Sequence, residues 1–234
     1  GYKQDRAEAA PGESVLLTLF WECEEAANCA DFSLSLRDET GVAAQTWALP
    51  AVRDGLPVDA WPDHGRLRGQ HIVSLPASLA GGRYRFSLGD FPLGELTIIA
   101  PERTFTQPEL VQSIDAAFTT ADGTPVATLA GVALDSAAPP CAPAPEATCS
   151  LPLVWRADGE ASVGYHAFVH LVDEAGNILA QSDAVPAGWT RPTTGWLPGE
   201  YVVDVHTLNL PNALPDGPLT LRVGLYDLVT GERL

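Results

Sequence analysis

The segment Leu210–Asp227 reads "LPNALPDGPLTLRVGLYD", and the segment Leu75–Phe91 reads "LPASLAGGRYRFSLGDF". The earlier segment aligns on the later one without gaps at a shift of 135 residues. Each has a Leu-Pro start, a turn rich in small residues and a strand, which is typical of a crossover leading into a core strand. Self-similarity of this kind indicates that the chain contains a repeated structural unit.

Other residues repeat in the same order and with nearly the same shift. The pentapeptide "GYKQD" at 1–5 corresponds to "GVALD" at 131–135, and the change in shift places a small insertion near Cys141. Further aligned pairs are His71 with His206, Trp61 with Trp196, Asp38 with Asp173, and Trp21 with Trp155. We therefore predict two homologous domains, 1–102 and 111–234, joined near "APERTFTQPEL".

Both domains are predicted to consist of antiparallel β-strands. The segments 31–47 and 165–182 each alternate apolar and polar residues on both sides of a turn that contains glycine, which is typical of a hairpin. No window of about 11 or more residues shows sustained helical periodicity. The expected fold class is all-β, with two tandem immunoglobulin-like or fibronectin-like antiparallel β-sandwich domains.

The two predicted domains differ at their ends. An extra strand, "SIDAAFTTADGTPVATLA" at 113–130, belongs to the second domain and has no counterpart in the first. In the first domain "GELTIIAPE" follows the repeated segment, whereas the second domain stops at "GERL", before a counterpart of "TIIA". Either the chain is a window from a longer array, or other copies or neighbouring domains supply the missing strands by addition at an open sheet edge.

The composition argues against two classes of partner. The net charge is −17 and Lys3 is the single lysine, so the chain is poorly suited to bind nucleic acid or anionic lipid. No apolar stretch approaches the roughly 20 residues of a membrane-spanning helix, so no membrane insertion is expected. Solubility alone explains the acidic balance, and a surface that collects divalent cations is the alternative.

The four cysteines form two local pairs, Cys23 with Cys29 and Cys141 with Cys149. Neither pair has CxxC spacing, and both lie in segments with the composition of loops. Two short disulfide loops are therefore expected, which predicts an exported protein at the cell surface or outside the cell. Four unpaired buried thiols are the alternative.

The second domain contains, in order, "LVW", "FVHLVDEAGNILAQSD" and "TTGWLPGEYVVDVHTLNLPNALPDGPLTLRVGLYDLVTGERL". This pattern resembles the β-sandwich modules at the extracytoplasmic C-terminal end of large bacterial membrane glycosyltransferase-like proteins, especially those of Chloroflexota. The resemblance covers 114–234 well and 1–100 more loosely. It implies an exported location and tandem occurrence, and it implies no sugar transfer because no catalytic membrane portion is present in this sequence.

Two histidines, His166 and His170, lie four residues apart on an expected strand, and Asp204 and His206 share a face of a later strand. These residue types could bind zinc if the two strands were adjacent. His206 has a counterpart in His71, whereas His166 and His170 have none. A histidine that repeats without the other ligands favours a structural role, so a metal site is not expected.

Aromatic residues in the second domain provide a candidate sugar-binding surface. Trp189, Trp196, Arg191 and Tyr201 are close in sequence, and a rigid exposed ring can stack on the apolar face of a sugar. Packing within loops is the alternative for these residues. Trp196 recurs beside a proline and could plug the end of a sandwich, whereas Trp189 has no clear counterpart in the first domain.

No catalytic motif is recognisable. The sequence has no GxSxG, no HExxH and no phosphate-binding glycine loop. The acidic turns Asp38-Glu39 and Asp173-Glu174 could hold calcium weakly, although hairpin turns favour aspartate for backbone reasons. We expect no other cofactor, and a non-catalytic structural or adhesive module of a longer surface or filament protein. A carbohydrate-binding module accessory to a glycan-active enzyme, or a hydrolase without a visible motif, are the alternatives.

Overall fold

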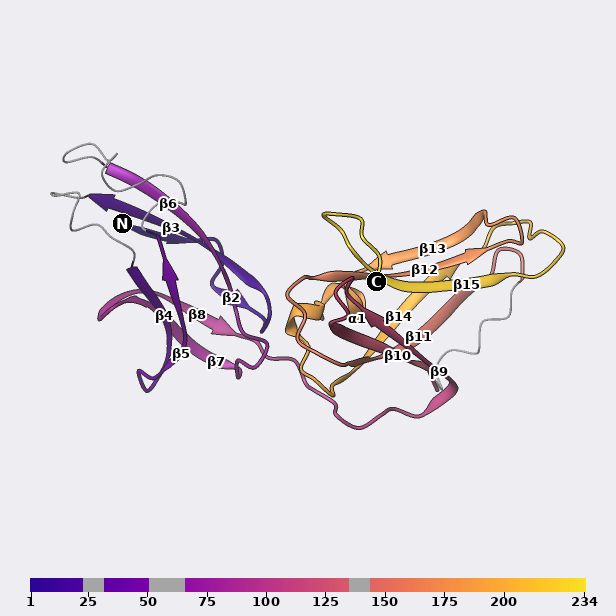
Figure 1. Cartoon of the computed structure of the whole chain (residues 1–234), viewed down its shortest axis with the longest axis horizontal. Helices are drawn as coiled ribbons and strands as arrows, with labels where there is room; N and C mark the ends of the chain where they lie inside the picture. Colours follow the sequence, from indigo (N-terminus) through magenta and orange to yellow (C-terminus); the bar gives the residue numbers. More distant parts are fainter. Residues whose placement is uncertain (23–31, 51–65, 135–143) are drawn as a thin grey trace. The chain divides into compact units, whose positions relative to one another are not determined.

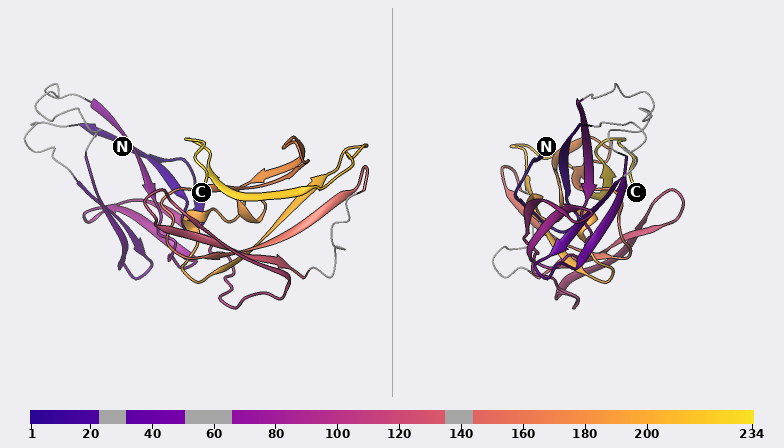
Figure 2. Two further views of the ribbon diagram at one scale, coloured as in Figure 1. Left: turned by 45° about the vertical axis from the view of Figure 1, so that its right-hand side comes forward. Right: turned by 90° about the vertical axis from the view of Figure 1, so that its left-hand side faces the viewer.

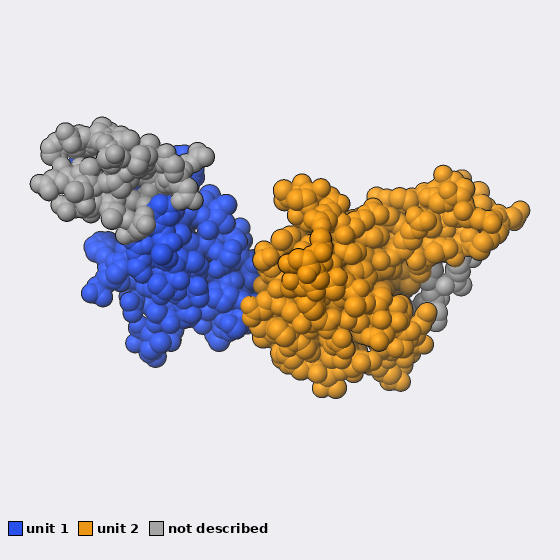
Figure 3. Space-filling view, viewed as in Figure 1, with its two compact units in different colours: residues 1–101 blue, residues 102–234 orange. Residues whose placement is uncertain are grey.

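The computed structural model describes residues 1–22, 32–50, 66–134 and 144–234. The chain divides into two compact units, Gly1–Pro101 and Glu102–Leu234 (Figure 3). Strands dominate both units, which confirms the all-β, sandwich-like fold class predicted from the alternating sequence pattern. Within the described residues, helices are short, and none is long and apolar enough to cross a membrane.

The first unit contains two sheets. A three-stranded sheet has the order β1-β3-β6, and a five-stranded sheet has the order β2-β8-β7-β4-β5 (Figure 1). The strands are β1 (Tyr2–Gln4), β2 (Glu8–Ala9), β3 (Ser14–Glu22), β4 (Phe32–Asp38), β5 (Ala43–Leu49), β6 (Arg66–Ser74), β7 (Gly82–Leu88) and β8 (Phe91–Ile98). Alternation along the strands brings Val15 and Leu17 of one sheet into a common core with Leu34, Leu36 and Phe86 of the other.

The second unit also contains two sheets, visible as two layers in Figure 2. One has the order β14-β11-β10-β9 and the other β13-β12-β15. The strands are β9 (Leu110–Thr119), β10 (Pro125–Ala133), β11 (Thr148–Ala157), β12 (Tyr165–Val172), β13 (Ile178–Ala184), β14 (Tyr201–Asn209) and β15 (Thr220–Asp227). A helical turn, α1 (Pro186–Trp189), and a 3-10 turn, Thr193–Gly195, connect β13 to β14. Trp155, Val169, Val202 and Leu225 lie in the core between the layers.

The strand registers of the two units match at the shifts found in the sequence. In the first unit Trp21 of β3 lies opposite Leu67 of β6, and in the second Trp155 of β11 lies opposite Val202 of β14. In the same way, Leu17 lies opposite His71 and Leu151 lies opposite His206. In the other sheet, Leu36 lies opposite Phe86 on one side and Gln45 on the other. Its counterpart Leu171 lies opposite Leu221 and Ala180. The repeated segments therefore occupy the same places in both pairs of sheets.

The two segments that begin with Leu75 and Leu210 carry the chain from one sheet to the other. They follow β6 and β14 in one sheet and lead to β7 and β15 in the other. The N–H of Leu75 donates to the carbonyl of Glu13 at 2.8 Å, and the N–H of Leu210 donates to the carbonyl of Ala147 at 2.9 Å. Both leucines are buried. Glu13 and Ala147 are themselves equivalent in the repeat, so the same hydrogen bond and the same apolar anchor fix both crossovers.

The segment 113–130, predicted as one extra strand, is a hairpin formed by most of β9 and the start of β10. Asp122 and Gly123 form the turn, in which Gly123 has a φ of 85° and its N–H donates to the carbonyl of Thr120 at 2.8 Å. Glycine adopts this left-handed backbone without the steric cost of a Cβ, so the chain reverses here. The first strand of this hairpin, β9, has no counterpart in the described part of the first unit.

A glycine on β15 makes room for an aromatic ring on β12. Gly224 lies directly opposite Phe168, and a Cβ placed on Gly224 would come within 2.6 Å of the Phe168 ring. An aromatic ring lying over a strand glycine covers backbone that would otherwise be exposed. The ring of Phe168 is accordingly buried on the outer face of this sheet.

Replacing Gly224 with alanine is expected to push the Phe168 ring away from the sheet and to lower the free energy of unfolding by about 1–3 kcal/mol. Urea or thermal unfolding of Gly224→Ala measures this loss. Gly164→Ala is the matched control, because a Cβ at Gly164 meets no atom within 4 Å. Unchanged stability of Gly224→Ala would contradict the close contact.

Equivalent aspartates close the turns that follow β4 and β12. The Oδ1 atom of Asp38 accepts hydrogen bonds from the N–H groups of Thr40 and Val42 at 2.9 and 3.0 Å. The two carboxylate oxygens of Asp173 accept from the backbone N–H and the side-chain amide of Asn177, both at 2.8 Å. The pKa of Asp38 is lowered, chiefly by the hydrogen bond from the Thr40 hydroxyl. The pKa of Asp173 is lowered, chiefly by the hydrogen bond from the side-chain amide of Asn177. These carboxylates, considered as calcium ligands, are engaged in holding their own turns.

The lowered pKa of Asp173 predicts a pH-dependent contribution to stability. A carboxyl whose folded-state pKa lies below its ordinary value of 3.8 stabilises the fold above that pH, and the contribution disappears as the pH falls through the folded-state pKa. Asp173→Ala is expected to unfold more easily than wild type at neutral pH, with the difference shrinking below pH 3.8. Denaturant unfolding over a pH series measures this, with Glu174→Gln as the neighbouring control. A difference that stays constant with pH would contradict the expectation.

Candidate functional site

A buried carboxylate, that of Asp204 on β14, organises one end of the second unit. Asp204 is 1% exposed and its Oδ2 accepts hydrogen bonds from Trp155 Nε1 at 3.1 Å and His206 Nε2 at 2.9 Å. Its Oδ1 accepts from the backbone N–H of Ala187 at 2.8 Å. A charge removed from water needs such partners, because an unpaired buried carboxylate is strongly unfavourable. Asp204 therefore ties β11 and β14 to the α1 turn.

The same network continues to β13 in the other sheet. His206 Nδ1 lies 3.0 Å from the hydroxyl of Ser182. Since a carboxylate can only accept, Nε2 carries the proton toward Asp204, and Nδ1 is the ring nitrogen that forms the hydrogen bond with Ser182. Serine, histidine and aspartate are the residue types of a hydrolase triad. His206 and Asp204 are each 1% exposed and Ser182 is partly buried, and the contact between His206 and Ser182 links the two sheets.

The first unit retains only part of this network. His71 is equivalent to His206 and lies edge-on to Phe32, with ring centroids 5.5 Å apart. Gly69 stands where the second unit has Asp204, and Trp47 stands where it has Ser182. The indole Nε1 of Trp21 is buried without a hydrogen-bond partner among the described residues. The tryptophan and histidine thus belong to the shared framework, whereas Asp204 and Ser182 are additions particular to the second unit.

The backbone held by Asp204 has an unusual conformation. Ala187, Gly188 and Trp189 have φ values of 54°, 61° and 71°, so three successive residues are left-handed and two of them carry a Cβ. Such residues cost roughly 1–3 kcal/mol each and persist only where surrounding contacts impose them. The bond from Ala187 to Asp204 and that from the Trp189 N–H to the Val185 carbonyl, 2.9 Å long, provide these contacts. The result is a hydrogen-bonded turn that displays the Trp189 side chain, which is 65% exposed.

Trp189 lies beside a group of aromatic side chains on the outer face of β12 and β15. The ring of His166 is edge-on to Trp189 at 5.3 Å between centroids, and to Tyr226 at 5.6 Å. Phe168 lies 6.2 Å from Tyr226, and the guanidinium of Arg233 stands 4.7 Å above the Phe168 ring. We call these five residues the aromatic face. Their packing explains why β12 is buried on both of its sides, although the sequence pattern marks only one side as core.

The structure does not bring together the four residues considered as zinc ligands. Asp204 and His206 meet, but His166 belongs to the aromatic face of the opposite sheet. His170 Nε2 lies 3.4 Å from a carboxylate oxygen of Asp183. No cluster of three or more His, Cys, Asp or Glu side chains suited to a metal ion is found in residues 1–22, 32–50, 66–134 and 144–234.

The four residues considered as a glycan platform do not form one exposed surface. Trp196 is 1% exposed, lies in the core, and donates its Nε1 hydrogen to the Arg191 carbonyl at 2.9 Å. The guanidinium of Arg191 is bound to the carboxylate of Glu200. Tyr201 is partly buried and its hydroxyl lies 3.5 Å from Gln107. Of the four residues, Trp189 alone presents an exposed aromatic ring. The ring of Trp196 points into the core, and that of Tyr201 is partly buried.

Glu200 is a buried residue that the sequence pattern did not single out. It is 0% exposed and lies between the guanidinium groups of Arg103 and Arg191. One oxygen also accepts from the Leu197 N–H at 3.0 Å. The N–H of the next residue, Tyr201, donates to the Thr104 carbonyl at 2.7 Å. This ion cluster fastens the segment around Arg103 to the rest of the second unit, which is a structural use of Glu200.

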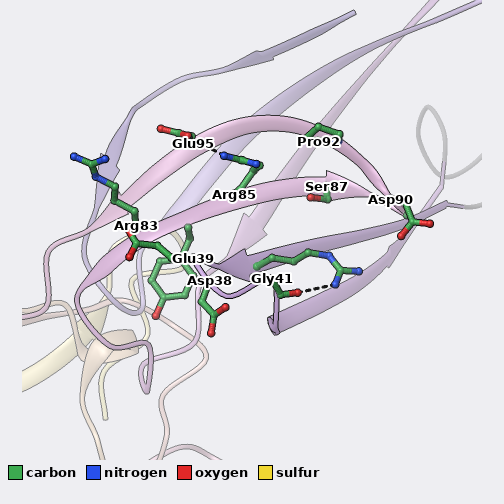
Figure 4. A pocket seen from close by; sticks show the side chains of 12 residues that line it. Asp38, Glu39, Gly41, Arg83, Arg85, Ser87, Asp90, Pro92 and Glu95 are labelled. Carbon is green, nitrogen blue, oxygen red and sulfur yellow. Dashed lines mark hydrogen bonds and ion pairs between the residues drawn. The ribbon is translucent and has the colours of Figure 1, made fainter.

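The first unit has a shallow surface cavity of about 570 Å³ over β4, β7 and β8 (Figure 4). Its charged lining residues are Arg37, Arg83, Arg85, Asp38, Glu39, Asp90 and Glu95. Arg85 pairs with Glu95 at 3.2 Å, and Arg37 donates to the Gly41 carbonyl at 3.0 Å, as the dashed lines show. Charges of both signs are mixed and largely exposed, so the cavity does not select one class of ligand. The aromatic face is the better candidate site.

One of the four cysteines lies within the described residues. Cys149 is on β11, is 2% exposed and is not a free thiol. Cys23, Cys29 and Cys141 lie outside the described residues. The pairings of Cys23 with Cys29 and of Cys141 with Cys149 therefore stay predictions.

Replacing Asp204 with asparagine is expected to destabilise the fold and to release Trp189. The amide offers one acceptor oxygen where three donors converge, so buried donors are left unpaired at a cost of about 1–3 kcal/mol. Denaturant unfolding measures the loss, and the NMR shifts of the His166 ring report whether Trp189 stays against it. Asp216→Asn, in an exposed turn, is the control. A variant with lost stability but unchanged His166 shifts would show that Asp204 does not position Trp189.

No protein-family model matches the chain, and no curated protein sequence matches it. Among solved structures, trypsin-activated alpha-2-macroglobulin from Escherichia coli is similar over 97% of this chain and 14% of that chain. The sequence identity is 12% and the TM-score is 0.28. A likeness of this extent carries no conclusion about function.

Proposed function

We propose that the chain is a non-catalytic, extracellular structural or adhesive module and forms one segment of a longer surface or filament protein. The observation that carries this proposal is the left-handed turn at Ala187–Trp189, which Asp204 holds in place. Strain of this kind is found where a local structure has a task that outweighs its cost. The task here is the display of the Trp189 side chain on the surface.

The uses of the buried charged groups support a structural role. Asp204 and Glu200 are each enclosed by donors from several segments, and both fix loops to the sheets. The shared register of the two units supports repetition of one framework along a longer protein. The buried, non-thiol state of Cys149 is in keeping with an exported protein. The resemblance to extracytoplasmic bacterial modules points the same way.

Carbohydrate is the second candidate ligand, favoured by the make-up of the aromatic face. Trp189 has an exposed ring, and His166 and Tyr226 beside it supply polar atoms next to apolar ring surface. Sugars bind to proteins in this way, with C–H groups against a ring and hydroxyls on polar groups at its rim. A carbohydrate-binding module accessory to a glycan-active enzyme would use the same surface.

Trp189→Ala is expected to weaken adhesion or glycan binding by about tenfold with only a small loss of stability, because the ring is 65% exposed and packs against the edge of His166. Beads coated with the protein are tested for adhesion to bacterial cells, and the free protein is tested on a glycan array. Phe105→Ala removes another exposed aromatic of the second unit and is the matched control.

The two assays separate the two candidates. Glycan binding that depends on Trp189 supports the carbohydrate-binding module, whereas bead adhesion that depends on Trp189 without glycan binding supports an adhesive module. If wild type and Trp189→Ala behave alike in both assays, the aromatic face is not the functional surface.

A further inference from the structure

A cavity of about 410 Å³ opens at one end of the second unit, where β10 and β12 begin. Three segments that are distant in sequence line it: the turn between β9 and β10, the loop between β11 and β12, and the turn that follows β15. Its volume lies in the range of roughly 300–1,000 Å³ that is usual for small-molecule sites. The size alone therefore admits a ligand.

The walls of this cavity are fixed by hydrogen bonds within the second unit. The N–H of Asp158, in the loop after β11, donates to the Val126 carbonyl on β10 at 3.1 Å. The hydroxyl of Thr193 accepts from the Tyr165 N–H at 2.9 Å and donates to the Val163 carbonyl at 2.8 Å. The loop and the start of β12 are thus held in position without a ligand.

Tyr165, the first residue of β12, lines the cavity and is 7% exposed. Its hydroxyl forms no hydrogen bond with any part of the chain that the structure describes. Burial is the main cause that raises the pKa of Tyr165, and the charges of Asp227, Glu232 and Asp122 add to the effect. Glu232 and Asp122 also line the cavity, so the hydroxyl lies on the cavity side. Buried polar groups are normally hydrogen-bonded, and a ligand here would supply the missing partner.

The rim of the cavity is acidic. Each of the three segments contributes one carboxylate, and these are Asp122, Glu160 and Glu232. The N–H of Asp227 donates to the Glu232 carbonyl at 2.9 Å, which closes the turn that carries Glu232. Among the described lining residues there is no lysine, arginine or histidine. Three carboxylates without a neighbouring base attract a cation.

The floor of the cavity is apolar. Val126 is 3% exposed and belongs to the core together with the Tyr165 ring, and the partly buried Ala161 and Val163 pack against them. An apolar floor below an acidic rim suits a cation that carries an aliphatic chain, because the chain can lie on apolar surface while the charge stays at the rim.

The arrangement of the carboxylates distinguishes between kinds of cation. A metal ion needs ligands that converge on one point, and no group of three or more suitable side chains exists in the described part of the chain. A guanidinium group gains most from two oxygens of one carboxylate, whereas an ammonium group donates to three separate acceptors. Carboxylates on three separate segments, with a neutral hydroxyl between them, therefore favour an ammonium group.

We propose that this cavity binds an aliphatic ammonium ion. Its alkyl chain lies on Val126 and Val163, and its ammonium group donates to the Tyr165 hydroxyl and to the carboxylates of the rim. A free polyamine and a lysine side chain of a partner polypeptide share this chemistry. The site goes beyond the adhesive role proposed above and does not use Trp189, because the core-facing Tyr165 and the aromatic face lie on opposite sides of β12.

The test uses the full chain with two probes, spermidine and Nα-acetyl-lysine methylamide. Binding is measured by calorimetry and by the NMR shifts of the Tyr165 ring and of the Val126 and Val163 amides. We expect saturable binding that shifts these signals. The Nε-acetylated lysine derivative keeps the alkyl chain but loses the charge, so it is expected to bind at least about tenfold more weakly.

Three variants test the residues of the site. Tyr165→Phe is expected to weaken binding about three- to tenfold without loss of stability, because the hydroxyl it removes has no partner in the free protein. Glu160→Gln and Glu232→Gln are each expected to weaken binding about two- to fivefold. Glu174→Gln is the matched control, since it removes the same charge from an exposed turn outside the cavity. The two glutamine variants decide the question if Tyr165→Phe does not fold.

The two probes also separate the sources of the ligand. Tighter binding of spermidine assigns a free polyamine, and tighter binding of the lysine derivative assigns a side chain of a partner polypeptide; both support the site. Trp189→Ala is expected to leave ammonium binding unchanged, so the loss of adhesion or glycan binding in that variant does not bear on the cavity.

Four results would overturn the proposal. The first is the absence of saturable binding of either probe at millimolar concentration, and the second is equal binding of the Nε-acetylated derivative. The third is equal weakening by Glu174→Gln and Glu232→Gln, which would show diffuse attraction to an acidic protein. The fourth is displacement of both probes by an equal concentration of calcium chloride with the same shifts at Tyr165, which would show a metal site.

Discussion

The burial of one carboxylate imposes much of the local structure in the second unit. Asp204 is almost completely removed from water, so its charge is compatible with the fold only if several donors converge on it. Those donors come from Trp155 on β11, His206 on β14 and the backbone of Ala187 in the α1 turn. Through His206 the constraint extends to Ser182 in the opposite sheet. The position of Trp189 follows from the same set of bonds, because Ala187 begins the left-handed turn.

The comparison of the two units separates framework from addition. Equivalent strands, equivalent crossovers and the Trp-His pair recur because a sandwich core tolerates little change in register: a slip of one residue would turn every apolar side chain outward. The first unit places Gly69 and Trp47 where the second has Asp204 and Ser182, and there the ring of Phe32 packs against both His71 and Trp21. The polar network is therefore not required to build the sandwich. It is used to hold a particular loop.

The sequence predicted the framework well, because it rests on features that are local or repeated. Alternation along β3 and β14 indicated strands, and the alignment of Leu75 with Leu210 predicted equivalent crossovers that the register confirms. The site was predicted less well. Asp204 and His206 share a face, as expected, but Ser182 approaches from the other sheet, and no sequence spacing reports a contact between sheets. A comparison of the two repeats at 69 and 204 would have singled out the added carboxylate.

Loop residues were predicted least well, for a physical reason. Trp196 and Trp189 lie in the same polar, proline-rich segment, yet one is in the core and the other is exposed. The exposure of each side chain depends on the backbone conformation beside it. Trp196 follows the 3-10 turn and points inward, whereas Trp189 ends the left-handed turn and points outward. Neither backbone conformation produces a periodic pattern in the amino-acid sequence. The burial of both sides of β12 was hidden in the same way, because it depends on side chains from β15 and α1.

The aromatic face depends on how β15 is held, because β15 contributes Tyr226 to it. Arg233 bridges Tyr226 through the backbone and covers Phe168 with its guanidinium. His166 packs against both Tyr226 and Trp189, so contacts that fix β15 also fix the ring against which Trp189 packs. The bridge at Arg233 and the hydrogen bond from Ala187 to Asp204 therefore support the aromatic face from two different segments of the chain.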